Sequence, residues 1–142
     1  MTRFDIFVSA QDAVWPAVTA ELAAGRKRSH WMWFVFPQIA GLGGSETAVR
    51  FAIGSLAEAR SYLAHPVLAP RLRQATGLIL CHAGREASLI LGHVDALKLR
   101  SSMTLFQAAD PAEPLFGAAL AAFSDGVPDP RTLALLKGAD LR

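Results

Sequence analysis

Residues 25–38 read GRKRSHWMWFVFPQ, and this stretch decides the fold. It joins three consecutive cations to the densest apolar run of the chain. Gly25 follows a helical pattern, where helices commonly end in a left-handed residue. Ser29 is a suitable N-cap for a second helix beginning at His30 and ending before Pro37, because the residue before a proline avoids the helical region. A buried strand is the alternative. No partner strand is evident elsewhere, so we expect a short, deeply buried helix.

Arg26, Lys27 and Arg28 would lie beside the N-terminus of that helix. Free N–H groups and the helix dipole attract anions there, and the cations add to the attraction. We therefore expect a phosphate or a carboxylate as the guest. In the alternative interpretation the cations form a solvated rim whose aliphatic stems cover the core. Taken alone, this stretch favours the rim.

Length and charge bound the class of protein. The 142 residues, 52% hydrophobic and 18% charged, predict one compact domain over residues 1–142. The net charge of only +2 is small for a dedicated nucleic-acid binder but compatible with a local anion site. Nucleic acid is therefore not the partner we expect, and no particular protein partner is indicated.

The chain shows no targeting or metal pattern. Cys81 is the only cysteine, which excludes an intrachain disulfide and fits a reducing compartment. The first ten residues lack the pattern of a signal peptide, and no apolar run approaches the roughly 20 residues that span a bilayer. The four histidines are scattered without zinc-ligand spacing, so we expect no metal site. These observations predict a soluble cytoplasmic protein with no membrane partner.

Helical spacing and capping residues predict seven to nine helices and no convincing strand, hence an all-α domain around the buried central helix. At the N-terminus we expect a short helix before Gln11, then one capped by Asp12 that ends at Ala24. Further helices are predicted from their caps. Ser45 would cap a helix that stops at Gly54, and Ser55 would cap the next in a Ser-x-x-Glu capping box. Asp95 would cap a later helix. Asp129 would cap the last one, with Pro130 at its first position and Gly138 as the stop.

The second decisive stretch, residues 97–106, reads LKLRSSMTLF. Apolar residues lie on more than one side of this predicted helix, which is typical of a buried helix. Lys98 and Arg100 lie on it nevertheless. A buried cation without a partner is costly, so each needs a carboxylate, a carbonyl, a bound anion or a path to water. A structural salt bridge, with Asp95, Glu86 or Glu113, is the alternative to an anion pocket.

Two such stretches in one small domain predict a shared pocket for a phosphate- or nucleotide-type ligand. Arginines bind oxyanions bidentately, and an indole can stack on a base. His30 is the best candidate acid or base, because an imidazole can exchange a proton near neutral pH. The expectation fails if these side chains are dispersed or paired only with internal carboxylates. The predicted ligand-binding residues are Arg26, Lys27, Arg28, Ser29, Trp33, Gln38, Lys98, Arg100, Ser101 and Ser102.

Both stretches, together with GLG at 41–43 and YLAHPVL at 62–68, resemble the bacterial domain-of-unknown-function family 1810 over nearly the whole chain. The resemblance implies a single, mainly α-helical domain. It implies no established activity, cofactor or catalytic residue. Some members carry the name calpastatin, but a calpain inhibitor of that kind is a repetitive, disordered chain, so we interpret that name as an error.

Two other hypotheses remain open. In the first, the protein is a non-enzymatic interaction module, which an exposed apolar patch and a filled centre would favour. In the second, it binds single-stranded nucleic acid by stacking bases on Trp31 or Trp33, which requires that these side chains be exposed.

Overall fold

The computed structural model describes residues 3–140, and within this range the chain forms helices and no β-sheet. The predicted all-α fold is confirmed. Nine helices lie within the described residues, at the upper end of the predicted range. They are α1 (Asp5–Ala24), α2 (Met32–Val35), α3 (Glu46–Arg50), α4 (Leu56–Leu63), α5 (Leu68–Leu80), α6 (Ala87–Leu91), α7 (His93–Ala109), α8 (Pro114–Ser124) and α9 (Pro130–Asp140).

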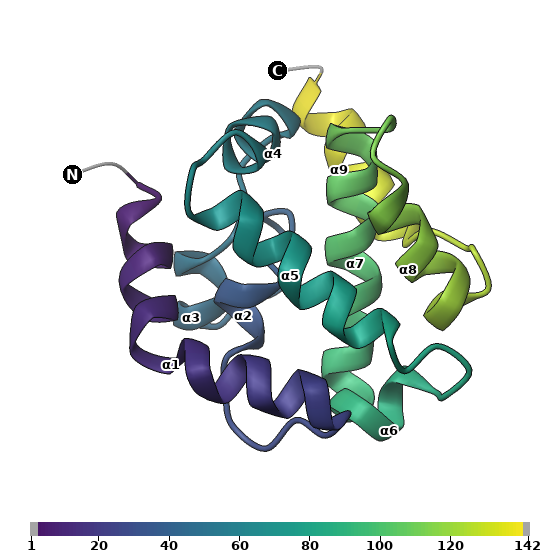
Figure 1. Cartoon of the computed structure of the whole chain (residues 1–142). Helices are drawn as coiled ribbons and strands as arrows, with labels where there is room; N and C mark the ends of the chain where they lie inside the picture. Colours follow the sequence, from purple (N-terminus) through teal and green to yellow (C-terminus); the bar gives the residue numbers. More distant parts are fainter. Residues whose placement is uncertain (1–2, 141–142) are drawn as a thin grey trace.

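Helix α5 crosses the middle of the molecule (Figure 1). It packs on α1 along one side and on α8 along the other, while α2 contacts both α1 and α5. Helix α7 is the second organising element, because α4, α6, α8 and α9 all pack against it. The described helices are therefore arranged about α5 and α7, with α2 against α1 and α5, rather than as an up-and-down bundle.

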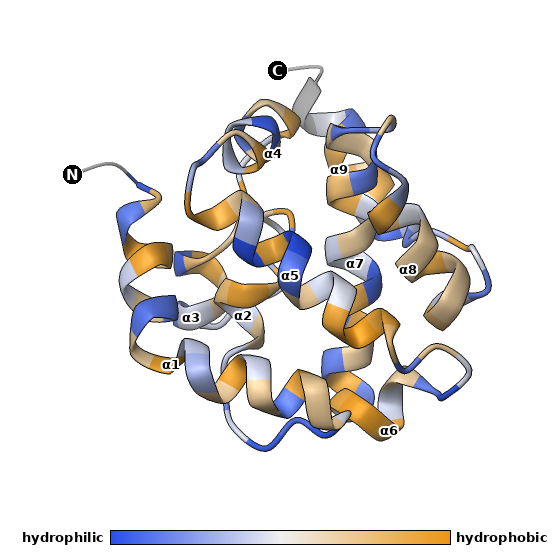
Figure 2. Cartoon of the chain, in the orientation of Figure 1, coloured by the Kyte–Doolittle hydropathy of each residue, from blue (hydrophilic) through white to orange (hydrophobic). Residues whose placement is uncertain are grey.

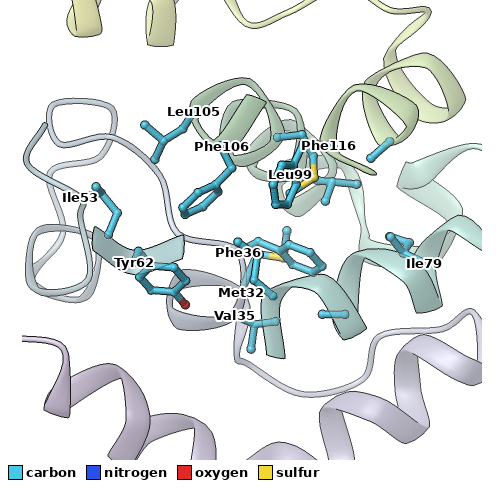
Figure 3. Packing of buried hydrophobic residues seen from close by; sticks show 14 of the residues in the cluster. Met32, Val35, Phe36, Ile53, Tyr62, Ile79, Leu99, Leu105, Phe106 and Phe116 are labelled. Carbon is cyan, nitrogen blue, oxygen red and sulfur yellow. The ribbon is translucent and has the colours of Figure 1, made fainter. Parts of the chain in front are cut away.

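The core is built around α2, as the apolar run predicts. Met32 and Val35 are each 1% exposed, and the flanking Trp31 and Phe36 are fully buried. Figure 3 shows Met32 and Phe36 on one side of this core, facing side chains from α7 and α8. Outside the core, the loop that follows α1 is hydrophilic along the lower edge of the molecule (Figure 2).

Helix α1 corrects the first sequence prediction. It runs unbroken from Asp5 to Ala24 with Pro16 inside it, so Asp12 is not an N-cap. The buried residues of α1 recur at helical spacing from Phe7 to Leu22, and this continuous apolar face stabilises one long helix across the proline. The Asp12 carboxylate instead pairs with an α5 guanidinium at 2.7 Å.

The predicted caps divide into two groups. Those of Ser45, Ser55 and Asp129 are confirmed, because each side chain accepts a backbone N–H from the first turn of its helix. The prediction for Asp95 is wrong: α7 already begins at His93. Gly138 is also not a stop, since α9 continues to Asp140.

One short extended contact was not predicted. Ile39 and Ile53 form an isolated parallel bridge, in which Ile53 N donates to Gln38 O and Ala40 N donates to Ile53 O, both at 2.8 Å. Helix α3 therefore ends at Arg50, before the residues predicted to continue it. The bridge holds the loop after α2 against the segment after α3. Over residues 3–140, no helix has the length and apolarity needed to cross a bilayer.

Candidate functional site

The basic loop, residues 26–29, is held by a carboxylate of the chain itself. Glu21, in the last turn of α1, accepts hydrogen bonds from the backbone N–H groups of Arg28 at 2.6 Å and Ser29 at 2.9 Å. It also accepts the Ser29 hydroxyl at 2.6 Å and the Trp31 indole N–H at 3.1 Å. Burial alone would raise the pKa of Glu21, but these bonds outweigh it and lower the pKa to about 2. The carboxylate is therefore ionised at neutral pH.

This arrangement corrects the predicted Ser29 cap. Helix α2 begins only at Met32, and its cap position is Trp31, with no capping side-chain bond. The Ser29 hydroxyl donates to Glu21 instead. The backbone N–H groups of Arg28 and Ser29, just before the predicted helix start, are thus already bound to an internal carboxylate. The side chains of Arg26, Arg28 and His30 form no ion pair or hydrogen bond with the described residues, and all three residues are exposed.

Asp95 joins the two predicted stretches. Its carboxylate lies 2.9 Å from Lys27 Nζ and 3.3 Å from Lys98 Nζ. The Lys27 side chain is only 8% exposed, so this residue is drawn inward rather than lying on the rim. Lys98 Nζ also lies 4.5 Å from the ring centroid of Trp33, within cation–π range. The stretches meet here through the predicted salt bridge to Asp95.

An open hollow of about 620 Å³ lies on the Trp33 side of α7. We call it the outer cleft. It lies between the Gly-rich loop before α3, the exposed side of α7 and the start of α9. Its lining residues are Trp33, Gln38, Leu42, Gly43, Gly44, Ser45, Ala48, Val94, Leu97, Lys98, Arg100, Ser101, Asp129 and Arg131.

Hydrogen bonds between α7 and the start of α9 set the far wall of the outer cleft. Arg100 Nε donates to Val127 O at 2.8 Å, and its Nη2 donates to Pro128 O at 2.9 Å. Ser101 donates to the Asp129 carboxylate at 3.1 Å. Burial raises the pKa of Asp129, but bonds from Thr132 and Ser101 prevail and the net pKa is lowered. Asp129 is therefore an ionised acceptor rather than a proton donor.

The structure brings together only part of the predicted set. Trp33, Gln38, Lys98, Arg100 and Ser101 line the outer cleft, whereas Arg26, Lys27, Arg28, Ser29 and His30 do not. The outer cleft is therefore not lined by both basic stretches as predicted: Glu21 holds the backbone of the first stretch, and Asp95 binds its Lys27. Ser102 does not line the cleft either: its hydroxyl is fully buried and has no hydrogen-bond partner among the described residues.

Sequence reasoning missed two parts of the cleft. The Gly-rich loop, residues 41–44, was given no role from the sequence, yet Gly43 and Gly44 line the hollow. Arg131 was given no role, although it adds a third cation. Its only local signal was its place after Pro130, which predicts the start of α9 but not its position beside α7.

The family model described as "Protein of unknown function (DUF1810)" matches residues 1–136. The chain belongs to this family. A comparison with curated proteins finds no significant match for this DUF1810 chain.

A solved structure supports the fold of this DUF1810 protein. The conserved hypothetical protein Rv1873 from Mycobacterium tuberculosis is 53% identical, with a TM-score of 0.92. The match covers 94% of this chain and 96% of the mycobacterial chain. Neither description assigns a ligand or a reaction.

Proposed function

We propose that this DUF1810 protein binds a small anion of phosphate or nucleotide type in the outer cleft. The observation that carries the proposal is the charge of the lining: Lys98, Arg100 and Arg131 oppose one carboxylate, Asp129. Asp95 neutralises Lys98, but no carboxylate among the described residues forms an ion pair with either arginine. An oxyanion would supply that charge and accept guanidinium N–H groups.

The two arginines would play different parts. Two nitrogens of Arg100 already donate to backbone carbonyls, so its position is set before any ligand arrives. Arg131 is exposed, and its side chain forms no bond with the described residues. Arg100 would thus provide a fixed positive charge, and Arg131 would close on the anion.

The proposal concerns binding and assigns no reaction. His30, the candidate acid or base, is exposed and does not line the cleft. Asp129, which does line it, is committed to hydrogen bonds with Ser101 and Thr132. A cytoplasmic location, expected from the sequence, remains part of the proposal.

A thermal-shift screen against nucleotides, sugar phosphates and simple oxyanions tests this function. A ligand at a hundred times its dissociation constant stabilises the folded state by about 2.7 kcal/mol. We expect Arg131→Ala to abolish the shift. Arg28→Ala is the matched control, because it removes the same charge from an exposed position outside the cleft. The proposal is overturned if no anion shifts the melting temperature, or if both variants weaken binding equally.

A protein-interaction module is the second candidate. Val94 and Leu97, on the exposed side of α7, are 63% and 53% exposed, and Val127 nearby is 51% exposed. Such apolar side chains favour a docked partner over free solvent. A concentration-dependent dimer in sedimentation, lost in Leu97→Ser, would support this candidate. Single-strand binding is less favoured, because Trp31 is fully buried and only the partly buried Trp33 is left to stack on a base.

A further inference from the structure

A second, smaller hollow of about 220 Å³ adjoins the outer cleft beneath the loop before α3. We call it the inner chamber. Five residues line both hollows, so the two lie next to each other: Trp33, Gln38, Leu42, Gly43 and Ala48. The remaining residues of the inner chamber are Ile39, Ala40, Gly41, Val49, Phe51 and Ala52.

The two hollows differ in chemistry. In the inner chamber, Gln38 and the indole N–H of Trp33 are the only polar side-chain groups of the lining. The outer cleft instead carries Lys98, Arg100 and Arg131. A molecule that fills both must therefore have an apolar end and an anionic end.

Close backbone packing forms the wall of the inner chamber. A Cβ on Gly43 would lie 2.8 Å from the Cβ of Ala48, so only glycine lets the loop approach α3 this closely. Gly41 has φ +105°, and a Cβ there would lie 3.1 Å from a Leu135 methyl group. Ile39, which also lines the chamber, is held by its bridge to Ile53. The chamber is thus bounded by tightly packed loop backbone.

Gln38 offers a directional contact at the boundary. Its side chain is partly exposed, and its amide forms no hydrogen bond with the described residues. An amide can both donate and accept, so it can bind the polar edge of a ring lying against Trp33. An aliphatic chain would leave both groups of the amide without a partner.

We propose that the ligand is a two-part anion, with a flat aromatic or heteroaromatic ring in the inner chamber and a phosphate or carboxylate in the outer cleft. A cavity of about 150 Å³ accepts benzene, so the 220 Å³ of the inner chamber holds a one- or two-ring group. The inference rests on the proposed function, since it places the anionic group at the same arginines. It adds the requirement for the ring.

The test compares four probes by calorimetry: inorganic phosphate, ribose 5-phosphate, phenyl phosphate and adenosine 5′-monophosphate. We expect at least one of the ring-bearing phosphates to bind about tenfold or more tightly than ribose 5-phosphate, because only the ring reaches the inner chamber. If ribose 5-phosphate binds as tightly as both ring-bearing probes, the two-part ligand is overturned while anion binding stands. If none of the four binds, the proposed function fails, and this inference with it.

Two substitutions separate the two hollows. Ala52→Leu fills the inner chamber alone, because Ala52 lines only that hollow. It should weaken the preferred ring-bearing probe about tenfold and leave ribose 5-phosphate within about twofold. Arg131→Ala should weaken both. Equal weakening of both probes by Ala52→Leu, in a protein with an unchanged melting profile, would overturn the inference. If Ala52→Leu melts abnormally, Ala40→Leu, at an exposed position lining the same chamber, replaces it.

Discussion

In the basic loop, the backbone N–H groups of Arg28 and Ser29 donate to the carboxylate of Glu21, which lies in the last turn of the preceding helix, α1. In the outer cleft, Arg100 donates only to backbone carbonyls, and Arg131 forms no bond with the described residues. Each region brings three cations together. In the first region the backbone donors already hold an internal carboxylate, whereas in the second the cations outnumber the carboxylates that line the hollow.

The comparison shows that basic residues near a helix start do not by themselves predict an anion site. Charge-assisted hydrogen bonds are about twice as strong as neutral ones, so the nearest carboxylate takes the available donors. Glu21 and Asp95 do so for the basic loop and for Lys27. An anion site is expected where the cations of a hollow outnumber its carboxylates, as they do between α7 and α9.

Removing the internal anion should have the largest effect on the basic loop. Glu21→Ala leaves four donors without their acceptor, and we expect a loss of about 3 kcal/mol in the free energy of unfolding. Chemical denaturation measures this loss. Glu86→Ala is the control: Glu86 is an exposed glutamate whose side chain forms no capping bond, so its loss should stay within about 0.5 kcal/mol. Equal losses in the two variants would mean that Glu21 does not organise the loop.

The pKa of Glu21 predicts where this stabilisation is lost. The folded-state pKa is depressed from 4.5 to about 2, so the stabilisation is complete above about pH 4.5 and declines as the pH falls towards 2. The difference in the free energy of unfolding between the wild type and Glu21→Gln should shrink as the pH falls through that window. Because Glu21 is partly exposed, solvent screens its charge and makes this change smaller. Denaturation curves at successive pH values measure it. A difference that stays constant from pH 6 to pH 2 would contradict the depressed pKa.

Asp95 pairs with one lysine from each region, Lys27 and Lys98, and its removal should have a smaller effect. Asp95→Asn leaves Lys27, with an 8% exposed side chain, without a counter-charge, and we expect a loss of about 2 kcal/mol. The double variant Asp95→Asn with Lys27→Met should recover part of this loss, because it removes the unpaired charge as well. Thermal unfolding of Asp95→Asn, of Lys27→Met and of the double variant tests the coupling. Simple addition of the two losses would show that the ion pair is not the cause.

Local signals predicted most of the helix ends. Ser55 and Asp129 could be predicted as caps because the bonded N–H lies three residues along the same chain. The same local rule predicted Ser29 as a cap, and that prediction was wrong because its hydroxyl donates to Glu21, a carboxylate of the preceding helix. Pro16 lies within a helix because burial of one face against α5 outweighs the missing hydrogen bond.

Tertiary contacts decided the rest of the candidate site. The sequence placed Lys98 and Arg100 on a helix with little room for charge, and both residues line the outer cleft. It could not place Arg131 beside them, because no pattern states where α9 docks. The sequence also could not show that the Ile39–Ile53 bridge brings the Gly-rich loop over a hollow. A single bridge leaves no periodic pattern of apolar residues in the sequence.

The smallest expected effect provides the sharpest test of the comparison. Arg26→Ala and Arg28→Ala should each change the free energy of unfolding by less than about 0.5 kcal/mol, because both residues are exposed and their side chains form no bonds with the described residues. They should also leave the affinity for inorganic phosphate unchanged within about twofold, whereas Arg131→Ala lowers it. If either variant abolishes phosphate binding, the anion site lies at the basic loop despite Glu21. The distinction between a loop whose backbone donors are occupied and a cleft with unpaired arginines would then fail, because long side chains can bind an anion away from a backbone that is already occupied.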